Sequence, residues 1–280
     1  MGRIGVAEAV DGHAHLLAET DYVARHLDAA AACGIARSVV SGLGSTWGML
    51  DNAGVLAAAE AFPERLIPLC FLVLGRDGVD AVTQARSRGF RGLKLTQPLI
   101  PYDDERAFPV YAKAEELGFP ILFHSGVMAH VRGVLTSAEF MRPLRLDGVA
   151  RRFPDLRLQI AHLGVPEYEV ATTLARIVPN ISVDLTGSPH SGWYTAKSPE
   201  FMAGLFHWPT WSRKLIFGTD VHYRDLPLAI AHHQRLLSAL NPTPEEEARI
   251  CRDNAREFLG ECPGEAYRSV GYTVEAKRDE

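Results

Sequence analysis

Short apolar runs rich in β-branched residues alternate along this chain with longer stretches of helical periodicity. This alternation predicts βα units and a parallel sheet, because parallel strands need a crossover connection that a helix usually supplies. The eight apolar runs cover residues 9–15, 36–41, 66–72, 90–95, 120–124, 156–162, 180–185 and 214–220. Each run is short enough for a strand, and helical patterns separate the runs and continue after the last one.

The helical stretches carry recognisable boundary signals. Those with the clearest pattern cover about residues 51–62, 104–117, 226–240 and 243–259. An Ala-rich tract before them stops at Gly34, a residue type that commonly follows a helix C-terminus. We expect Pro109 to interrupt the second stretch. The last stretch opens with Thr243 as N-cap, Pro244 at the first helical position and an acidic first turn.

Eight strands alternating with helices over this length favour a (β/α)₈ TIM barrel in the α/β class, with a doubly wound open sheet as the alternative. We expect a single domain over residues 1–280. The barrel would occupy about 8–260 with extra C-terminal helices, and 261–280 would form a polar C-terminal tail. No linker rich in Pro, Gly or Ser, fixed-period repeat or low-complexity block divides the sequence.

Composition and charge exclude several functional classes. The 280 residues are 47% hydrophobic and 22% charged, as in ordinary globular proteins. The net charge of −5 and the lack of a basic run argue against a nucleic-acid partner. No signal peptide and no apolar run of about 20 residues is present, so we expect no membrane association. The four cysteines form no Cys-x-x-Cys pair, which favours reduced thiols in a cytoplasmic protein.

Metal-binding residue types recur at the ends of the predicted strands. In Val10-Asp11-Gly12-His13-Ala14-His15-Leu16, the two histidines at i and i+2 point to one face of a strand. A His-x-His pair alone is weak, but other runs end in similar residue types. Those residues are Lys94, His124, His162 and Asp220. Because barrel active sites lie at the C-terminal ends of the strands, we expect these side chains to share one site.

Six segments of the chain carry a wider resemblance. They are Asp11-Gly12-His13-Ala14-His15, Gly92-Leu93-Lys94-Leu95, Leu122-Phe123-His124-Ser125-Gly126, Ile160-Ala161-His162-Leu163-Gly164, Phe217-Gly218-Thr219-Asp220 and Asp253-Asn254-Ala255-Arg256-Glu257-Phe258-Leu259-Gly260. In this order they resemble the amidohydrolase superfamily, and within it the amidohydrolase-related (amidohydrolase 2) branch of metal-dependent TIM-barrel hydrolases and decarboxylases. The similarity runs from about residue 10 to 260.

The resemblance implies a divalent metal centre. His13, His15, His124 and Asp220 would be the metal ligands, and we expect one Zn²⁺, with Mn²⁺ as the alternative. A water in the open coordination position would become the nucleophile or proton carrier. Asp220 would act as general base. His162 would bind a second metal or, in a one-metal site, polarise the substrate or relay protons.

Lys94 decides between one metal and two. Some superfamily members carry a carboxylated lysine at this position, which bridges two metals. The alternative is an unmodified ammonium that binds a substrate carboxylate, and we favour it together with a one-metal site. A buried lysine without a partner would be costly, so some anion should face it.

Several loop residues are further candidates for substrate binding. They are His190 and Trp193 after the seventh run, and His222 and Arg224 after the eighth. Active-site loops lie on that face of a barrel, and Arg224 could hold an acidic substrate. The alternative for His190 and Trp193 is a purely structural role in the loop. Asp184 is a candidate hydrogen-bond partner for a ligand histidine.

The favoured reaction is hydrolysis, in which metal-bound water attacks a lactone, amide or ester carbonyl of a small acidic or cyclic substrate. The first alternative is non-oxidative decarboxylation of an aromatic or unsaturated acid at the same site. Hydrolysis is favoured by the length of the chain and by Ser125, which follows His124 where such decarboxylases tend to carry proline. The second alternative is a catalytically inactive barrel that serves as a binding subunit. The expected partners are a small-molecule substrate and, as in related proteins, a second copy of the chain in a homodimer.

Overall fold

Eight parallel strands form the centre of the molecule in a computed structural model that describes residues 3–188, 190 and 193–262. They pair in chain order, as β1-β2-β3-β4-β5-β6-β7-β8. The strands are β1 (Ala9–His15), β2 (Ile35–Ser41), β3 (Leu66–Leu72), β4 (Gly92–Leu95), β5 (Ile121–Phe123), β6 (Leu158–Ile160), β7 (Ile181–Asp184) and β8 (Leu215–Ile216). The predicted TIM barrel is therefore confirmed, and the order differs from that of a doubly wound open sheet.

The first and last strands meet at Gly12, and this contact nearly closes the barrel. The Gly12 N–H donates to the Phe217 carbonyl at 2.8 Å. A Cβ at Gly12 would lie 2.5 Å from Ile216 Cγ2 and 3.0 Å from the Phe217 oxygen, so a larger residue would push β8 away. The neighbouring His13 and Asp220 are drawn together by the same approach, since the Asp220 N–H donates to the His13 carbonyl at 2.8 Å.

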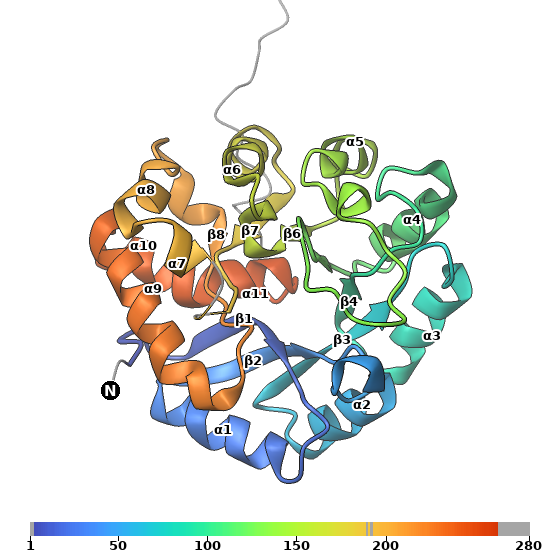
Figure 1. Cartoon of the computed structure of the whole chain (residues 1–280), viewed down its shortest axis with the longest axis horizontal. Coiled ribbons are helices and arrows are strands. Elements are labelled where there is room, and N and C mark those ends of the chain that lie inside the picture. The colour runs from blue at the N-terminus through green and yellow to red at the C-terminus, as the bar shows by residue number, and fades with distance from the viewer. Residues whose placement is uncertain (1–2, 189, 191–192, 263–280) are drawn as a thin grey trace, which may run out of the picture.

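Helices surround the strands in the view down the short axis of the molecule (Figure 1). The helices are α1 (Tyr22–Ala32), α2 (Asn52–Ala61), α3 (Val79–Arg88), α4 (Phe108–Glu116), α5 (Arg145–Arg152), α6 (Tyr168–Ile177), α7 (Trp193–Ala196), α8 (Pro199–Gly204), α9 (Leu226–Leu240), α10 (Pro244–Ala248) and α11 (Asn254–Phe258). In the described part of the chain, no helix is both long enough and apolar enough to span a bilayer.

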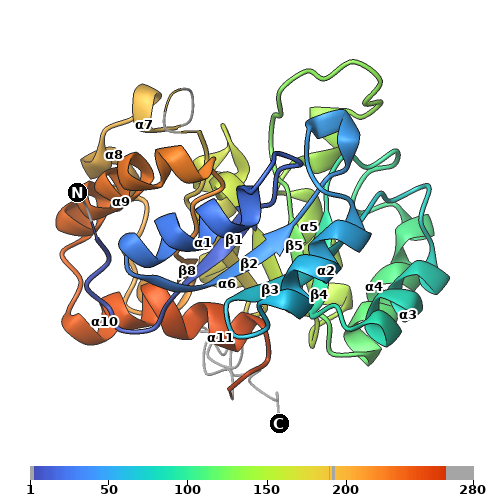
Figure 2. The same cartoon turned by 90° about the horizontal axis from the view of Figure 1, so that it is seen from below.

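The buried apolar side chains form two clusters. The larger cluster lies between strands and helices, while a smaller one joins strand residues such as Val10, Ile67 and Leu122 to Ala255 and Phe258 of α11. Figure 2 shows α10 and α11 together at one end of the strands. The C-terminal helix thus seals the amino-terminal end of the barrel with apolar side chains, which leaves the opposite end for polar chemistry.

Two of three sequence predictions about local structure need correction. Pro109 does not interrupt a helix but lies in the first turn of α4, where its missing N–H breaks no hydrogen bond. The predicted helical stretch at 243–259 is confirmed, since α10, the π-helical turn η7 (Arg249–Asp253) and α11 follow one another without a break. The sixth strand ends at Ile160, so His162 lies beyond it in the short helical turn η4 (Ala161–Gly164).

Other boundary predictions agree with the structure. Thr243 forms a capping box with Glu246, in which each side chain bonds the other residue's backbone N–H. The cysteines Cys33, Cys70, Cys251 and Cys262 are free thiols. Most of the predicted polar tail, residues 263–280, lies outside the described residues.

Candidate functional site

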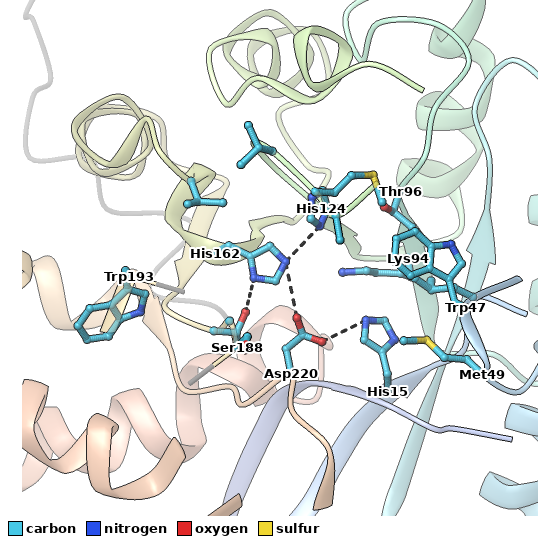
Figure 3. Close-up of a pocket in the computed structure, with 17 residues that line it drawn as sticks. His15, Trp47, Met49, Lys94, Thr96, His124, His162, Ser188, Trp193 and Asp220 are labelled. Atoms are coloured by element: carbon cyan, nitrogen blue, oxygen red, sulfur yellow. Dashed lines mark hydrogen bonds and ion pairs between the residues drawn. The ribbon is translucent and has the colours of Figure 1, made fainter. Parts of the chain in front are cut away.

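A pocket of about 510 Å³ opens where the carboxyl ends of the strands meet. Its lining includes His15, Lys94, His124, His162 and Asp220, so the structure brings together five of the six residues picked out at the strand ends. Figure 3 shows the side chains of His15, His162 and Asp220 pointing toward one another. His13, the sixth residue, is fully buried just below the lining and lies with its ring centroid 5.4 Å from that of His15.

His13 is oriented from behind by Asp184 of β7. Its Nδ1 lies 3.1 Å from Asp184 Oδ2, a carboxylate oxygen that can only accept, so the imidazole carries its proton on Nδ1. Burial, followed by the charge of Lys94, lowers the pKa of His13 to about 4. The ring is therefore neutral at pH 7, and Nε2 presents a lone pair on the side away from Asp184.

Asp184 accepts hydrogen bonds from five donors. They are His13 Nδ1, Gln159 Nε2, the His162 N–H, and the N–H and Oγ1 of Thr186. Burial alone would raise the pKa of Asp184, but the interactions with His13, His162 and Thr186 hold it well below its usual range. Asp184 is thus an anion held by hydrogen bonds, and it positions both His13 and the segment that carries His162.

A chain of hydrogen bonds runs from Thr186 through His162 to His124. Thr186 Oγ1 donates to Asp184, so the contact of 2.8 Å between Thr186 Oγ1 and His162 Nδ1 places a proton on that nitrogen. His162 Nε2 then accepts from His124 Nδ1 at 3.1 Å. His124 therefore carries its proton on Nδ1, and its Nε2 is unprotonated. This buried nitrogen has no hydrogen-bond partner among the described residues.

The position of His162 depends on an unusual backbone conformation. His162 has φ +57° and Leu163 has φ +45°, so the chain turns sharply at the end of β6 and carries the imidazole over the barrel. Residues with a Cβ are rarely found in this region. The hydrogen bond from the His162 N–H to Asp184 Oδ1 at 2.8 Å holds the turn in place.

His15 and Asp220 meet at the floor of the pocket. His15 Nδ1 lies 3.2 Å from the Ser41 carbonyl, an acceptor, so His15 Nε2 carries the lone pair. That nitrogen lies 3.4 Å from Asp220 Oδ1, and His162 Nε2 lies 3.8 Å from Asp220 Oδ2. Two acceptors that face each other repel unless a cation or a proton lies between them. Burial raises the pKa of Asp220, because it disfavours the charged carboxylate.

Asp11 fixes the turn that carries Asp220. It is fully buried and accepts hydrogen bonds from the N–H and Oγ1 of Thr219 and from the N–H of His13. Burial raises the pKa of Asp11 to about 7, with these hydrogen bonds acting in the opposite direction. Asp220 itself has φ +50°, a conformation that the bonds on either side of it stabilise.

Lys94 is the cation at this site. Its Nζ lies 2.8 Å from His13 Nε2, the lone-pair nitrogen, and only 1% of the residue is exposed. Burial lowers its pKa to about 8, against the opposing effect of Asp220 and Asp184. Two carboxylates thus stabilise the charge of Lys94, while its hydrogen-bond partner is the imidazole of His13.

The donor set fits a divalent metal ion. One ligand atom each from His13, His15 and Asp220 lie within 4.8 Å of one another. The unpartnered Nε2 of His124 and the opposed lone pairs of His15 and Asp220 are left unsatisfied by the protein alone. Neutral imidazoles with a carboxylate are ligands that zinc and manganese accept. An ion would compete with Lys94 for the lone pair of His13.

Of the four loop residues predicted to bind substrate, one lines the pocket. Trp193 lines the pocket, and its Nε1 donates to the Leu185 carbonyl at 2.9 Å. His190 is exposed and lies 3.5 Å from Asp225, while His222 lies 3.3 Å from Glu19. Arg224 is exposed and stacks over Tyr223. These three residues are not among the described lining residues of the pocket, and their role in substrate binding remains a prediction.

Sequence reasoning did not single out several residues at the site. Trp47, Met49, Thr96 and Thr186 line the pocket, and Thr186 also links His162 to Asp184. Thr96 could have been predicted to line the site, because it follows Lys94 by two residues and alternate residues of a strand share a face. Trp47 ends the short 3₁₀ helix η1 (Ser45–Trp47) after β2 and Met49 follows it, and periodicity gives no signal for so short an element.

Comparisons with solved structures agree with the barrel fold. The 2,6-dihydroxybenzoate decarboxylase from Rhizobium is 14% identical, with a TM-score of 0.65 over 91% of this chain and 99% of its own. A probable 2-pyrone-4,6-dicarboxylic acid hydrolase from Acinetobacter baumannii is 16% identical, with a TM-score of 0.64 over 90% and 99%. A 5-carboxyvanillate decarboxylase from Novosphingobium aromaticivorans with bound manganese is 14% identical, with a TM-score of 0.60 over 84% and 80%.

These structural similarities show a shared fold, while a family model gives the assignment. A comparison with curated proteins gave no match. The family model described as amidohydrolase matches residues 10–260, which include all of the barrel strands except Ala9 of β1 and all six strand-end residues of the site. The chain therefore belongs to the amidohydrolase family, whose members are metal-dependent enzymes that include hydrolases and decarboxylases.

Proposed function

We propose that the protein is a metal-dependent hydrolase that cleaves a lactone, amide or ester bond of a small cyclic or acidic substrate. The observation that carries the proposal is the position of Asp220, between His15 at 3.4 Å and His162 at 3.8 Å on the floor of the pocket. Burial raises the pKa of this carboxyl, which strengthens it as a proton acceptor. Asp220 would take the proton of the attacking water, and His162 would pass it on.

His13, His15, His124 and Asp220 would hold one divalent ion, with zinc as the first candidate and manganese as the alternative. When bound, the ion lowers the pKa of water and polarises a substrate oxygen. To ligate it, His13 Nε2 must give up its contact with Lys94 Nζ. The released ammonium would then be free to bind an anionic group of the substrate, which supports an unmodified Lys94 and a one-metal site.

Decarboxylation of an aromatic or unsaturated acid is the second candidate function. It is favoured by the composition of the pocket, in which one buried lysine lies among apolar side chains such as Leu43, Met49, Val127 and Met128. Lys94 would bind the carboxylate, and Asp220 in its protonated form could deliver a proton to carbon. Two of the structurally similar proteins are decarboxylases, which supports keeping this alternative.

Product analysis separates the two reactions. Protein loaded with Zn²⁺ or Mn²⁺ would be incubated with dihydrocoumarin and phenyl acetate, and separately with 2,6-dihydroxybenzoate and 5-carboxyvanillate, followed by mass spectrometry. Addition of water to the lactone or ester supports the hydrolase, whereas release of carbon dioxide from the acids supports the decarboxylase. Turnover of neither group by the loaded protein would contradict both assignments for these substrate classes.

Asp220→Asn tests the role of the carboxylate in whichever reaction is found. We expect kcat to fall by about 10²–10⁴-fold, because general acid–base catalysis contributes on this order. Asp225→Asn is the matched control, since Asp225 lies outside the pocket lining and contacts exposed His190. Unchanged kcat in Asp220→Asn would rule out proton transfer by this residue.

A further inference from the structure

The hydroxyl of Thr186 lies between a buried carboxylate and an imidazole. Its Oγ1 donates to Asp184 Oδ1 at 2.7 Å and lies 2.8 Å from His162 Nδ1. The Thr186 N–H donates to the same carboxylate oxygen at 3.1 Å, and only 1% of the residue is exposed. These two bonds hold Thr186 in place, so its hydroxyl oxygen is a fixed neighbour of His162 Nδ1.

The direction of these hydrogen bonds determines which nitrogen of His162 carries the proton. A hydroxyl has one proton to donate, and an ionised carboxylate accepts it more strongly than a neutral imidazole does. Because Thr186 gives its proton to Asp184, its oxygen accepts from His162 Nδ1. Among the described residues, Thr186 is the one hydrogen-bond partner of that nitrogen. The hydroxyl thus selects between the two neutral forms of the His162 ring.

His162 and His124 are both neutral at pH 7, so they differ in tautomer and not in charge. Burial lowers the pKa of His162 to about 4 and lowers that of His124 well below its ordinary value. Each ring then carries one proton, which can lie on Nδ1 or on Nε2. A change of tautomer moves this proton from one nitrogen to the other and leaves the charge of the ring unchanged.

The tautomer of His162 sets the tautomer of His124. His162 Nε2 lies 3.1 Å from His124 Nδ1, a contact drawn in Figure 3, and one proton lies between these two nitrogens. When His162 Nε2 is the acceptor, His124 donates from Nδ1 and keeps a lone pair on its Nε2. If the His162 proton moved to Nε2, the His124 proton would move to its own Nε2. That nitrogen could then no longer bind a metal ion.

We propose that Thr186 is a positioning residue that holds His124 in its metal-binding tautomer by fixing the proton of His162. The hydroxyl acts on His124 without contacting it, through one intervening ring. This role deepens the proposed function, on which it rests for His124 as a metal ligand. The tautomers themselves belong to the metal-free protein, so they can be measured before any metal or substrate is added.

Nitrogen NMR of the metal-free protein tests the proposal, because imidazole chemical shifts distinguish a protonated from an unprotonated ring nitrogen. The histidines would carry a ¹⁵N label, and the loss of signals in His124→Asn and His162→Asn would assign the two rings. In the wild type we expect both rings to be protonated on Nδ1. Thr186→Val keeps the shape of the side chain but leaves His162 Nδ1 without an acceptor, so both protons should move to Nε2.

Two further variants separate the hydroxyl from its surroundings. Thr186→Ser keeps the hydroxyl and should keep the wild-type tautomers. Thr172→Val is the matched control, because Thr172 is a buried threonine whose hydroxyl donates to the Tyr168 carbonyl within α6, away from both histidines. It loses a buried hydrogen bond as Thr186→Val does, but its histidine spectrum should match that of the wild type.

Zinc affinity, measured by competition with a chromogenic chelator, gives the second readout. We expect it to fall by about 10–100-fold in Thr186→Val and to stay within about threefold of the wild type in Thr186→Ser and Thr172→Val, since the partners of ligand histidines have effects of this size. Equal losses in Thr186→Val and Thr172→Val would indicate a general loss of stability and would overturn the positioning role.

The wild-type spectrum alone can overturn the proposal, even if Thr186→Val does not fold. A His162 proton on Nε2 in the wild type, or a Thr186→Ser spectrum with both protons on Nε2, would do so. Wild-type tautomers or wild-type zinc affinity in Thr186→Val would also overturn it and would leave the proposed function standing. The expected tautomer shift in a protein that neither binds metal nor turns over substrate would support the control of His124 by Thr186 and contradict the proposed function.

Discussion

Asp184 orients most of the side chains at the candidate site, although it does not line the pocket. Its five hydrogen bonds fix the tautomer of His13 and the strained turn at His162. The sequence identified Asp184 as a partner for a ligand histidine because it ends an apolar run. It did not reveal Thr186, the hydroxyl that completes the chain to His124, because a threonine after a strand carries no distinctive signal.

Replacing Asp184 with asparagine should weaken metal binding without touching a ligand. The amide adds an N–H₂ group where the carboxylate accepts from every neighbour, so at least one buried donor loses its partner. We expect metal affinity to fall by about 10–100-fold and the free energy of unfolding by about 3 kcal/mol. Competition with a chromogenic chelator and denaturant titration measure these two effects. Asp147→Asn, at an exposed helical ion pair with Arg151, is the control, and equal metal affinity in the two variants would contradict the role of Asp184.

Among the elements, strands were predicted more accurately than the turns that follow them. The first and third runs, at residues 9–15 and 66–72, coincide with β1 and β3. The sixth and eighth runs were predicted too long. His162 and Asp220 directly follow the apolar runs in the sequence, but both have positive φ values and are not in strands. These turns depend on hydrogen bonds to Asp184 and His13 from distant parts of the chain, which local periodicity does not contain.

The turn after β5 has a requirement for glycine that can be tested. Gly126 has φ +95°, and a Cβ there would lie 1.8 Å from the Val165 carbonyl oxygen, so the segment after η4 would have to move. Gly126→Ala should destabilise the protein by about 2 kcal/mol more than Gly133→Ala, which has φ +87° but nothing within 4 Å of its Cβ. Thermal unfolding of both variants measures the difference. Because His124 lies two residues away, Gly126→Ala should also weaken metal binding, and equal stability of the two variants would contradict this packing constraint.

For the molecule as a whole, the alternation of apolar runs was enough to predict the barrel and the end at which its site lies. Apolar side chains of α11 close one end, and polar residues on β1, β4 and β7 and just after β5, β6 and β8 gather at the other. The walls of the pocket were less predictable, because Trp47 and Met49 come from a connecting segment between β2 and α2 that has no strand or α-helical periodicity. The ligand set was therefore accessible from strand ends, whereas substrate recognition required the structure.

Metal content tests the central claim that His13, His15, His124 and Asp220 form one metal site. Elemental analysis would follow incubation of the protein with Zn²⁺ or Mn²⁺ and removal of free metal, alongside His15→Asn/His124→Asn and the exposed control His190→Asn. We predict about one ion per chain in the wild type and the control, and almost none in the double variant. Two ions per chain would contradict a one-metal site with unmodified Lys94. No bound metal in the wild type, or equal amounts in all three proteins, would contradict the site itself.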